Sequence, residues 1–136
     1  MAGSKSDYME NKVLDILGGT TFTAPATVYI GLWTATLSDS STGSTAGEVS
    51  GGSYARAAVT NNSTNWPAAS GGAKSNGTEI AFTQATADWG TVTHAAILDA
   101  ATNGNILYWF DLTTSRNVQT NDIFKFAAGA IALTEA

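Results

Sequence analysis

The stretch TADWGTVTHAAILDAATNGNILYWFDL, residues 86–112, decides the fold. It holds the only histidine of the chain, two of its four tryptophans and almost no charge. Residues 91–100 and 105–112 flank the sequence ATNG, and an Asn-Gly pair between two apolar runs favours a type I′ turn. We therefore expect a central β-hairpin here, and not the wall of an active site.

The second strand of this hairpin is apolar on both faces. Its side chains fall into two alternating sets, which are Ile106, Tyr108, Phe110 and Leu112 on one face and Leu107 and Trp109 on the other. Such a strand must be covered on both sides. We expect the domain core to cover one face, and the N-terminal helix or a neighbouring subunit to cover the other.

The N-terminal segment SDYMENKVLDILGG, residues 6–19, predicts one short helix. Asp7 is placed to cap it, and Glu10 follows three residues later, as in a capping box. The pair Gly18-Gly19 ends the helix. An apolar stripe is expected at near-helical spacing, formed by Met9, Val13, Ile16 and Leu17.

The remaining chain alternates short apolar runs with turn residues. Beside the hairpin, strands are expected over residues 27–34, 54–60, 78–83, 116–120, 122–128 and 130–135. The polar loop 38–53 is flexible by its composition, and 61–77 forms a second long loop. This pattern predicts a mainly β fold, an antiparallel β-sandwich or jelly-roll-like domain with a short N-terminal α-helix. Residues 1–19 are the expected N-terminal arm and helix, and residues 20–136 the single β-sandwich domain.

Composition excludes several classes of partner. The chain has 136 residues, a net charge of −5 and only 12% charged residues. An acidic chain is not attracted to nucleic acid or to an anionic membrane surface. No cysteine is present, which excludes disulfides and thiolate chemistry. No apolar run reaches the ~20 residues of a membrane span, and the polar N-terminus is no secretory signal, so we expect assembly in a cytoplasm.

Catalytic, cofactor and metal sites are not predicted. His94 shares a strand face with Val92, Ala96 and Leu98 under strict alternation, which indicates a core histidine. No serine lies in a nucleophile-elbow pattern, and the acids are scattered and match no calcium loop. We therefore expect a protein without enzymatic activity.

The aromatic residues are the remaining candidates for contact. Rings of this kind stack on sugars, but they also anchor cores and protein interfaces. Arg56 stands alone among uncharged residues, and we expect it to pair with a carboxylate or to stack on a ring. The candidate protein-contact residues are Tyr54, Arg56, Trp66, Trp89 and Trp109.

Three segments together resemble a family of small virion proteins of tailed bacteriophages. They are TAPATVYIGLWTA (23–35), EVSGGSYARAAVT (48–60) and FTQATADWGTVTHAAILDAATNGNIL (82–107). Members of this family are commonly labelled tail fibre proteins, and proteins of this kind also serve as capsid decoration or cement proteins. The resemblance implies a non-enzymatic structural part of a virus particle, without catalytic residues or cofactors. The chain departs from the family pattern at Trp33 and in the loop around Trp66, where particle-specific contacts are expected.

The short length and the lack of repeats favour a capsid decoration or cement protein that binds and stabilises the shell surface. Its expected partners are other virion proteins, above all the major capsid protein, with no nucleic acid and no membrane. The alternative is a tail fibre or tail-associated adhesion module that contacts host surface polysaccharide, and a small esterase around His94 ranks third. Edge strands with few charges suggest a homo-oligomer. The expected location is the virion, assembled in the host cytoplasm.

Overall fold

The structure, a computed structural model, describes residues 2–135. Met1 and Ala136, the outer ends of the two predicted segments, lie outside the described residues. The described chain contains one helix, α1 (Asp7–Leu17), and nine strands. The strands are β1 (Ala2–Lys5), β2 (Thr27–Trp33), β3 (Ala57–Thr60), β4 (Ala73–Ser75), β5 (Ile80–Ala81), β6 (Gly90–Leu98), β7 (Ile106–Val118), β8 (Lys125–Phe126) and β9 (Ala132–Thr134).

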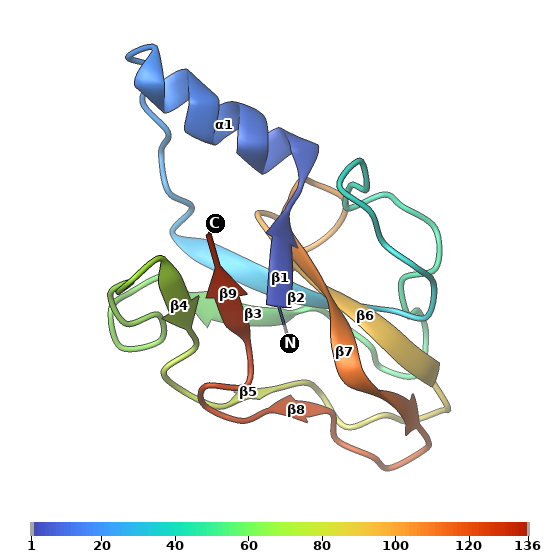
Figure 1. The fold of residues 1–136 in the computed structure, drawn as a ribbon. Helices are drawn as coiled ribbons and strands as arrows, with labels where there is room; N and C mark the ends of the chain where they lie inside the picture. The colour runs from blue at the N-terminus through green and yellow to red at the C-terminus, as the bar shows by residue number, and fades with distance from the viewer. Residues whose placement is uncertain (1, 136) are drawn as a thin grey trace.

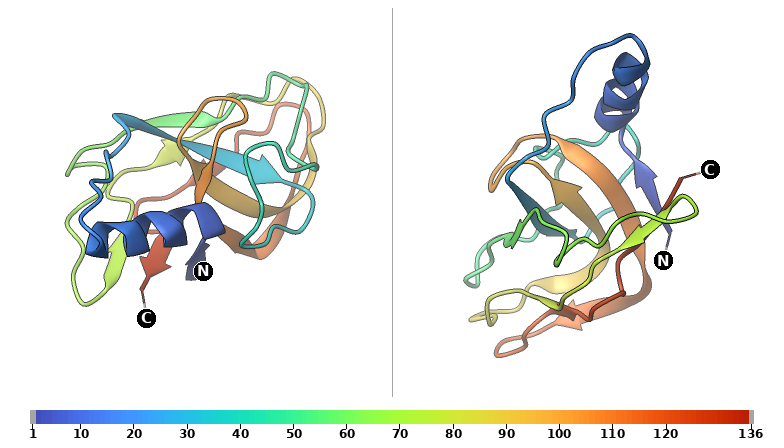
Figure 2. Two further views of the ribbon diagram at one scale, coloured as in Figure 1. Left: turned by 90° about the horizontal axis from the view of Figure 1, so that it is seen from above. Right: turned by 90° about the vertical axis from the view of Figure 1, so that its left-hand side faces the viewer.

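Seven strands form one curled sheet in the order β3-β2-β6-β7-β1-β9-β4, and β5 and β8 pair in a second small sheet (Figure 1). The mainly β prediction with one short N-terminal helix is confirmed. The sheet is mixed, because β1 runs parallel to β9 while the other paired neighbours are antiparallel. The large sheet and the β5–β8 pair enclose the main core between them (Figure 2).

The hairpin β6–β7 lies at the centre of the large sheet, as predicted. Residues 99–105 connect the two strands, and within them Asn103 and Gly104 have positive φ angles of 53° and 73°, the sign that both central residues of a type I′ turn have. Two register shifts interrupt the pairing, between Val92 and His94 and between Ile97 and Leu98. At the first shift, residues 112–115 of β7 lie opposite Thr93 alone, so side chains on either side of it no longer alternate simply. Val92 therefore lies in the main core while Ala96 and Leu98 face the opposite side of the sheet, and the predicted shared face was wrong.

A second apolar cluster covers that opposite face. Its buried members are Trp33, Leu37, Ala96, Leu98 and Ile106, with Trp109 packed against them. Leu37 comes from the segment that follows β2, so this segment covers the outer face of the hairpin. No residue of α1 belongs to this cluster, so the predicted cover by the N-terminal helix was wrong here, and cover by a neighbouring subunit stays a prediction.

Strand β1 was not predicted, and it is what attaches α1 to the sheet. The residues AGSK pair antiparallel with β7 and parallel with β9, inside the region assigned to an arm. Gly3 allows this close packing, since a Cβ atom there would lie 2.6 Å from the Leu133 side chain. The N-terminal strand is thus an interior strand of the sheet.

The N-cap of α1 is Ser6, and not the predicted Asp7. The Ser6 hydroxyl accepts a hydrogen bond from the Met9 amide at 3.2 Å. Gly18 closes the helix, as expected, and Gly19 follows with φ of +90°. No residue of α1 is buried, but Met9 of the predicted apolar stripe packs against the main core, as does Tyr8. The other members of the stripe, Val13, Ile16 and Leu17, are exposed. Figure 1 shows the helix leaving the sheet at the end of β1, with its C-terminal half projecting beyond the strands.

Candidate functional site

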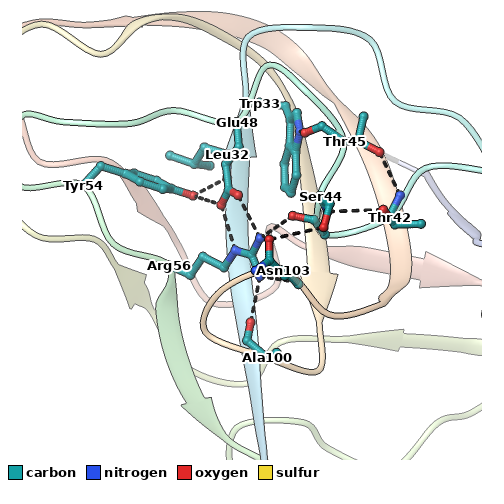
Figure 3. A network of polar contacts seen from close by, with 11 residues as sticks. Leu32, Trp33, Thr42, Ser44, Thr45, Glu48, Tyr54, Arg56, Ala100 and Asn103 are labelled. Carbon is teal, nitrogen blue, oxygen red and sulfur yellow. Dashed lines mark hydrogen bonds and ion pairs between the residues drawn. The ribbon is translucent and has the colours of Figure 1, made fainter.

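Arg56, immediately before β3, is the centre of the most extensive polar network among the candidate residues (Figure 3). Its side chain is 2% exposed. Nε and Nη2 each donate to the Glu48 carboxylate at 2.8 Å. Nη2 also donates to the Gly43 carbonyl at 3.0 Å, and Nη1 donates to the carbonyls of Ala100 at 2.8 Å and Asn103 at 2.9 Å. All five N–H groups of the guanidinium are therefore used.

This arrangement, which we call the Arg56 clamp, joins two loops. Gly43 and Glu48 belong to the loop 38–53, and Ala100 and Asn103 belong to the β6–β7 turn. The guanidinium carbon also lies 5.9 Å from the centre of the Trp33 ring. The prediction that Arg56 pairs with a carboxylate or stacks on a ring is thus confirmed, and both contacts are present.

Tyr54 extends the clamp to β2. Its hydroxyl donates to Glu48 at 2.8 Å and accepts from the Leu32 amide at 3.0 Å. Burial is the main reason that the pKa of the Tyr54 hydroxyl lies well above its usual value. The hydroxyl therefore stays protonated and serves as a fixed hydrogen-bond donor. Loop 38–53, expected to be flexible, is held against the sheet by these bonds.

The side of the clamp that faces solvent is hollowed. A cavity of about 470 Å³ is lined by both loops, including Glu48, Tyr54, Arg56 and Thr102. All donors of the Arg56 guanidinium and the Glu48 Oε2 atom already form hydrogen bonds within the chain. The guanidinium therefore has no free donor for a ligand, and its role is to position the backbone of the two loops.

Two of the candidate tryptophans lie in the main core. Trp66 is 7% exposed and Trp89 is 5% exposed, although both come from loops. The Trp89 indole donates to the Gly52 carbonyl at 2.9 Å, and its ring meets the Tyr54 ring edge-on at 5.3 Å. The expected contact roles of these residues stay predictions, and the burial of both rings shows that they anchor their own loops.

Trp109 and Trp33 occupy the second cluster. Trp109 is half-buried, and its indole donates to Asp39 at 2.9 Å. It is therefore the candidate tryptophan with the largest open surface. Trp33 is fully buried and donates to the Thr45 carbonyl at 3.0 Å, so the particle-specific contact expected at Trp33 is replaced by an internal one.

Among the described residues, no carboxylate is hydrogen-bonded to His94 to orient it as in a catalytic triad. The histidine is half-buried, and Nδ1 lies 2.9 Å from the Thr93 hydroxyl. Its ring lies 6.3 Å from that of Trp109, at the sheet surface and outside the two buried clusters, so the core assignment was wrong. Within residues 2–135, no three side chains of the metal-binding types gather into a cluster.

An apolar depression lies at the end of the molecule where α1 leaves the sheet. We call it the apolar mouth, a cavity of about 120 Å³ lined by Val28, Asn61, Trp66, Lys74, Ile97, Leu107, Tyr108 and Leu133. Five of these residues fall on predicted strands, whereas Asn61, Trp66 and Lys74 come from the predicted loop 61–77, so the sequence pattern did not bring the two groups together.

A polar group closes one edge of the mouth. The Tyr108 hydroxyl donates to Glu135 at 2.9 Å, and Lys5 forms an ion pair with the same carboxylate. Burial, followed by the Glu135 contact, raises the pKa of Tyr108 to about 12. The neighbouring Lys5 in turn lowers the pKa of Glu135.

In the described part of the chain, no helix is long and apolar enough to cross a membrane. A comparison with curated proteins found no match. A family model described as podophage GP4 fiber I protein gp80 matches residues 4–134. This match spans both loops of the Arg56 clamp, the central hairpin and α1, and it confirms the resemblance that the sequence motifs carry. The chain belongs to the podophage GP4 fiber I protein gp80 family.

Proposed function

We propose that this chain is a non-enzymatic structural component of a bacteriophage virion and that it works as a module of a tail fibre. The observation that carries the proposal is the family match over residues 4–134, because the matched family is described by a fibre protein. The match covers nearly the whole chain, so it concerns the entire fold and not a shared fragment.

The geometry of the Arg56 clamp supports a structural role. The buried Arg56 guanidinium binds the Glu48 carboxylate and three backbone carbonyls, and it holds two loops at one end of the sheet. Side chains of an active site instead keep donors or acceptors free for substrate. A rigid pair of loops suits a protein that presents one surface to its neighbours.

Capsid decoration, favoured by the short length of the chain, is the competing role. The two roles differ in copy number and in position on the particle. A decoration protein occupies the shell in many copies, whereas a fibre module is limited by the few attachment points of the tail.

The test is quantitative mass spectrometry on particles separated into heads and tails. The proposal expects the chain in the tail fraction, at a few copies per attachment point. Recovery with the heads, at a ratio near one per major capsid subunit, would favour decoration instead. Recovery in neither fraction would reject both virion roles.

Contact with host polysaccharide is a second proposed role, and Trp109 is the residue that favours it. Its ring is partly open on the outer face of the sheet, next to His94. A Trp109→Phe variant keeps an aromatic ring but changes its size and loses the bond to Asp39. If the ring stacks on sugar, phage carrying the variant should adsorb more slowly with unchanged fibre content, while an unchanged adsorption rate would reject this role.

A further inference from the structure

The C-terminal half of α1 carries an apolar face that the described chain leaves uncovered. Val13, Leu14, Ile16 and Leu17 expose 42%, 65%, 52% and 90% of their surfaces. They are four of the five exposed large hydrophobic residues described, and they all lie on two turns of one helix. Exposed apolar residues scattered singly are ordinary, but a cluster of this kind marks a contact surface.

The start of α1 is fixed, which keeps this face away from its own sheet. Ser6 is buried, and its hydroxyl and amide bond to the carbonyls of Ile106 and Leu107, the latter at 3.1 Å. The Asp7 amide donates to the Asp39 carbonyl at 2.7 Å. These bonds set the direction of the helix, which projects beyond the strands (Figure 2, right).

The apolar mouth lies beside the base of the helix. Lys5, two residues before α1, is paired in register with Tyr108, which lines the mouth. The single charged residue in its lining is Lys74. The Lys74 ammonium donates to the Pro67 carbonyl at 2.9 Å, and none of the ion pairs found in residues 2–135 involves it.

The charges of the two surfaces are complementary. Helix α1 carries three acids and one lysine, a net charge of −2, and its last turn has no basic residue. Glu10 lies one turn before Leu14 and two turns before Leu17, so this carboxylate belongs to the exposed apolar face. A carboxylate covered by an apolar partner requires a cation beside it, and Lys74 is the cation that the mouth supplies.

We infer that the occupant of the apolar mouth is α1 of a second copy of this chain, with Glu10 of the helix facing Lys74 of the mouth. This inference goes beyond the proposed function, because it holds for a fibre module and for a decoration protein alike. The net charge of −5 makes copies repel each other in general, so association needs such a local match.

The area of the contact favours a closed assembly. A patch of four large aliphatic side chains is on the order of a few hundred Å², while a stable interface buries roughly 800 Å² per partner. When each copy gives one helix and receives another, the area per copy doubles. A closed arrangement also leaves no helix and no mouth exposed, as an open chain of copies does at its ends.

Light scattering on the purified chain measures the assembly. We expect a defined small multiple of the monomer mass at micromolar concentration. Leu14→Glu should raise the dissociation constant at least tenfold, and Asn11→Glu, which adds the same charge on the polar face, should not. A wild-type chain that stays monomeric at several hundred micromolar, or a Leu14→Glu variant that assembles like wild type with unchanged circular dichroism, overturns the inference.

Cysteine pairing tests where the helix binds, since the chain has no cysteine of its own. Leu14→Cys mixed with Lys74→Cys should give a disulfide-linked pair in high yield, and Asn11→Cys mixed with Lys74→Cys should give little. Leu14→Cys that links to itself as efficiently would show helix packing on helix and overturn the assignment of the mouth. The charge exchange Glu10→Lys with Lys74→Glu should restore the association that each change alone weakens, and failure to restore it counts equally against the inference.

Discussion

Replacing Arg56 with alanine removes the five donors of the Arg56 clamp at once. The change leaves the Glu48 carboxylate unpaired and takes the donors from the carbonyls of Gly43, Ala100 and Asn103. Removing one partner of a buried ion pair costs about 3–5 kcal/mol. Glu48 keeps 21% of its side chain exposed and can regain water, which places Arg56→Ala near ~3 kcal/mol, at the lower end of that range.

This loss is a substantial part of the stability of an ordinary domain, about 5–15 kcal/mol, but it is smaller than that stability. The variant should therefore fold, with a midpoint of thermal denaturation roughly 10 °C lower. Urea denaturation followed by tryptophan fluorescence gives the change in unfolding free energy. Hydrogen exchange should show loss of protection in loop 38–53 and in the β6–β7 turn before other regions.

The matched control is Lys125→Ala, which breaks the exposed pair that Lys125 forms with Glu79 at 3.9 Å. Both side chains of this pair are at least half exposed, so its removal should change the unfolding free energy by less than about 0.5 kcal/mol. A double-mutant cycle of Arg56→Ala with Glu48→Gln should show a coupling of about 1–3 kcal/mol. If Arg56→Ala destabilises by less than ~1 kcal/mol, or the cycle shows no coupling, the clamp does not hold the loops.

Three further predictions concern the second cluster, the edge of the apolar mouth and the central turn. Leu37→Ala should lower the unfolding free energy measured by urea denaturation by about 2–4 kcal/mol, since Leu37 is 2% exposed. A change under ~1 kcal/mol would mean that the segment after β2 does not cover the outer face of the hairpin. The pKa of Tyr108 is raised to about 12, whereas its value in the unfolded chain is 10.0. The contribution of Tyr108 to the unfolding free energy is therefore complete below pH 10 and is lost as the pH rises towards 12. Tyr108→Phe should flatten this decline, and an unfolding free energy that falls with alkaline pH as in wild type would refute it. Gly104→Ala should destabilise by at least about 1 kcal/mol, because φ is +73° and a Cβ atom would lie 2.6 Å from the Ala100 side chain. Thermal denaturation measures this, and an unchanged midpoint would refute the need for glycine at this position.

Local sequence signals were sufficient to predict the elements whose conformation depends on residues that are neighbours in the chain. The Asn-Gly pair predicts the turn at Asn103 and Gly104, and the glycine pair predicts the end of α1. The isolated cation Arg56 indicates a buried partner, but the identity of that partner, Glu48, depends on how two distant loops meet.

Elements that depend on contacts between residues far apart in the sequence could not be predicted from the pattern of apolar and polar residues. Strand β1 consists of four small or polar residues, and it forms because β7 and β9 both have a free edge for it. The bulge after Val92 reverses the faces that simple alternation assigns, which moved His94 away from the main core. The burial of Trp66 and Trp89 arises because their loops fold back over the core, and a loop sequence carries no signal for that.

Cryo-electron microscopy of the intact particle is the most direct measurement of where this chain works. Density at the tail fibres that accommodates the curled seven-stranded sheet, with the projecting α1 in contact with another copy, is the predicted result. The same domain repeated over the capsid lattice, or absent from the particle, would contradict it.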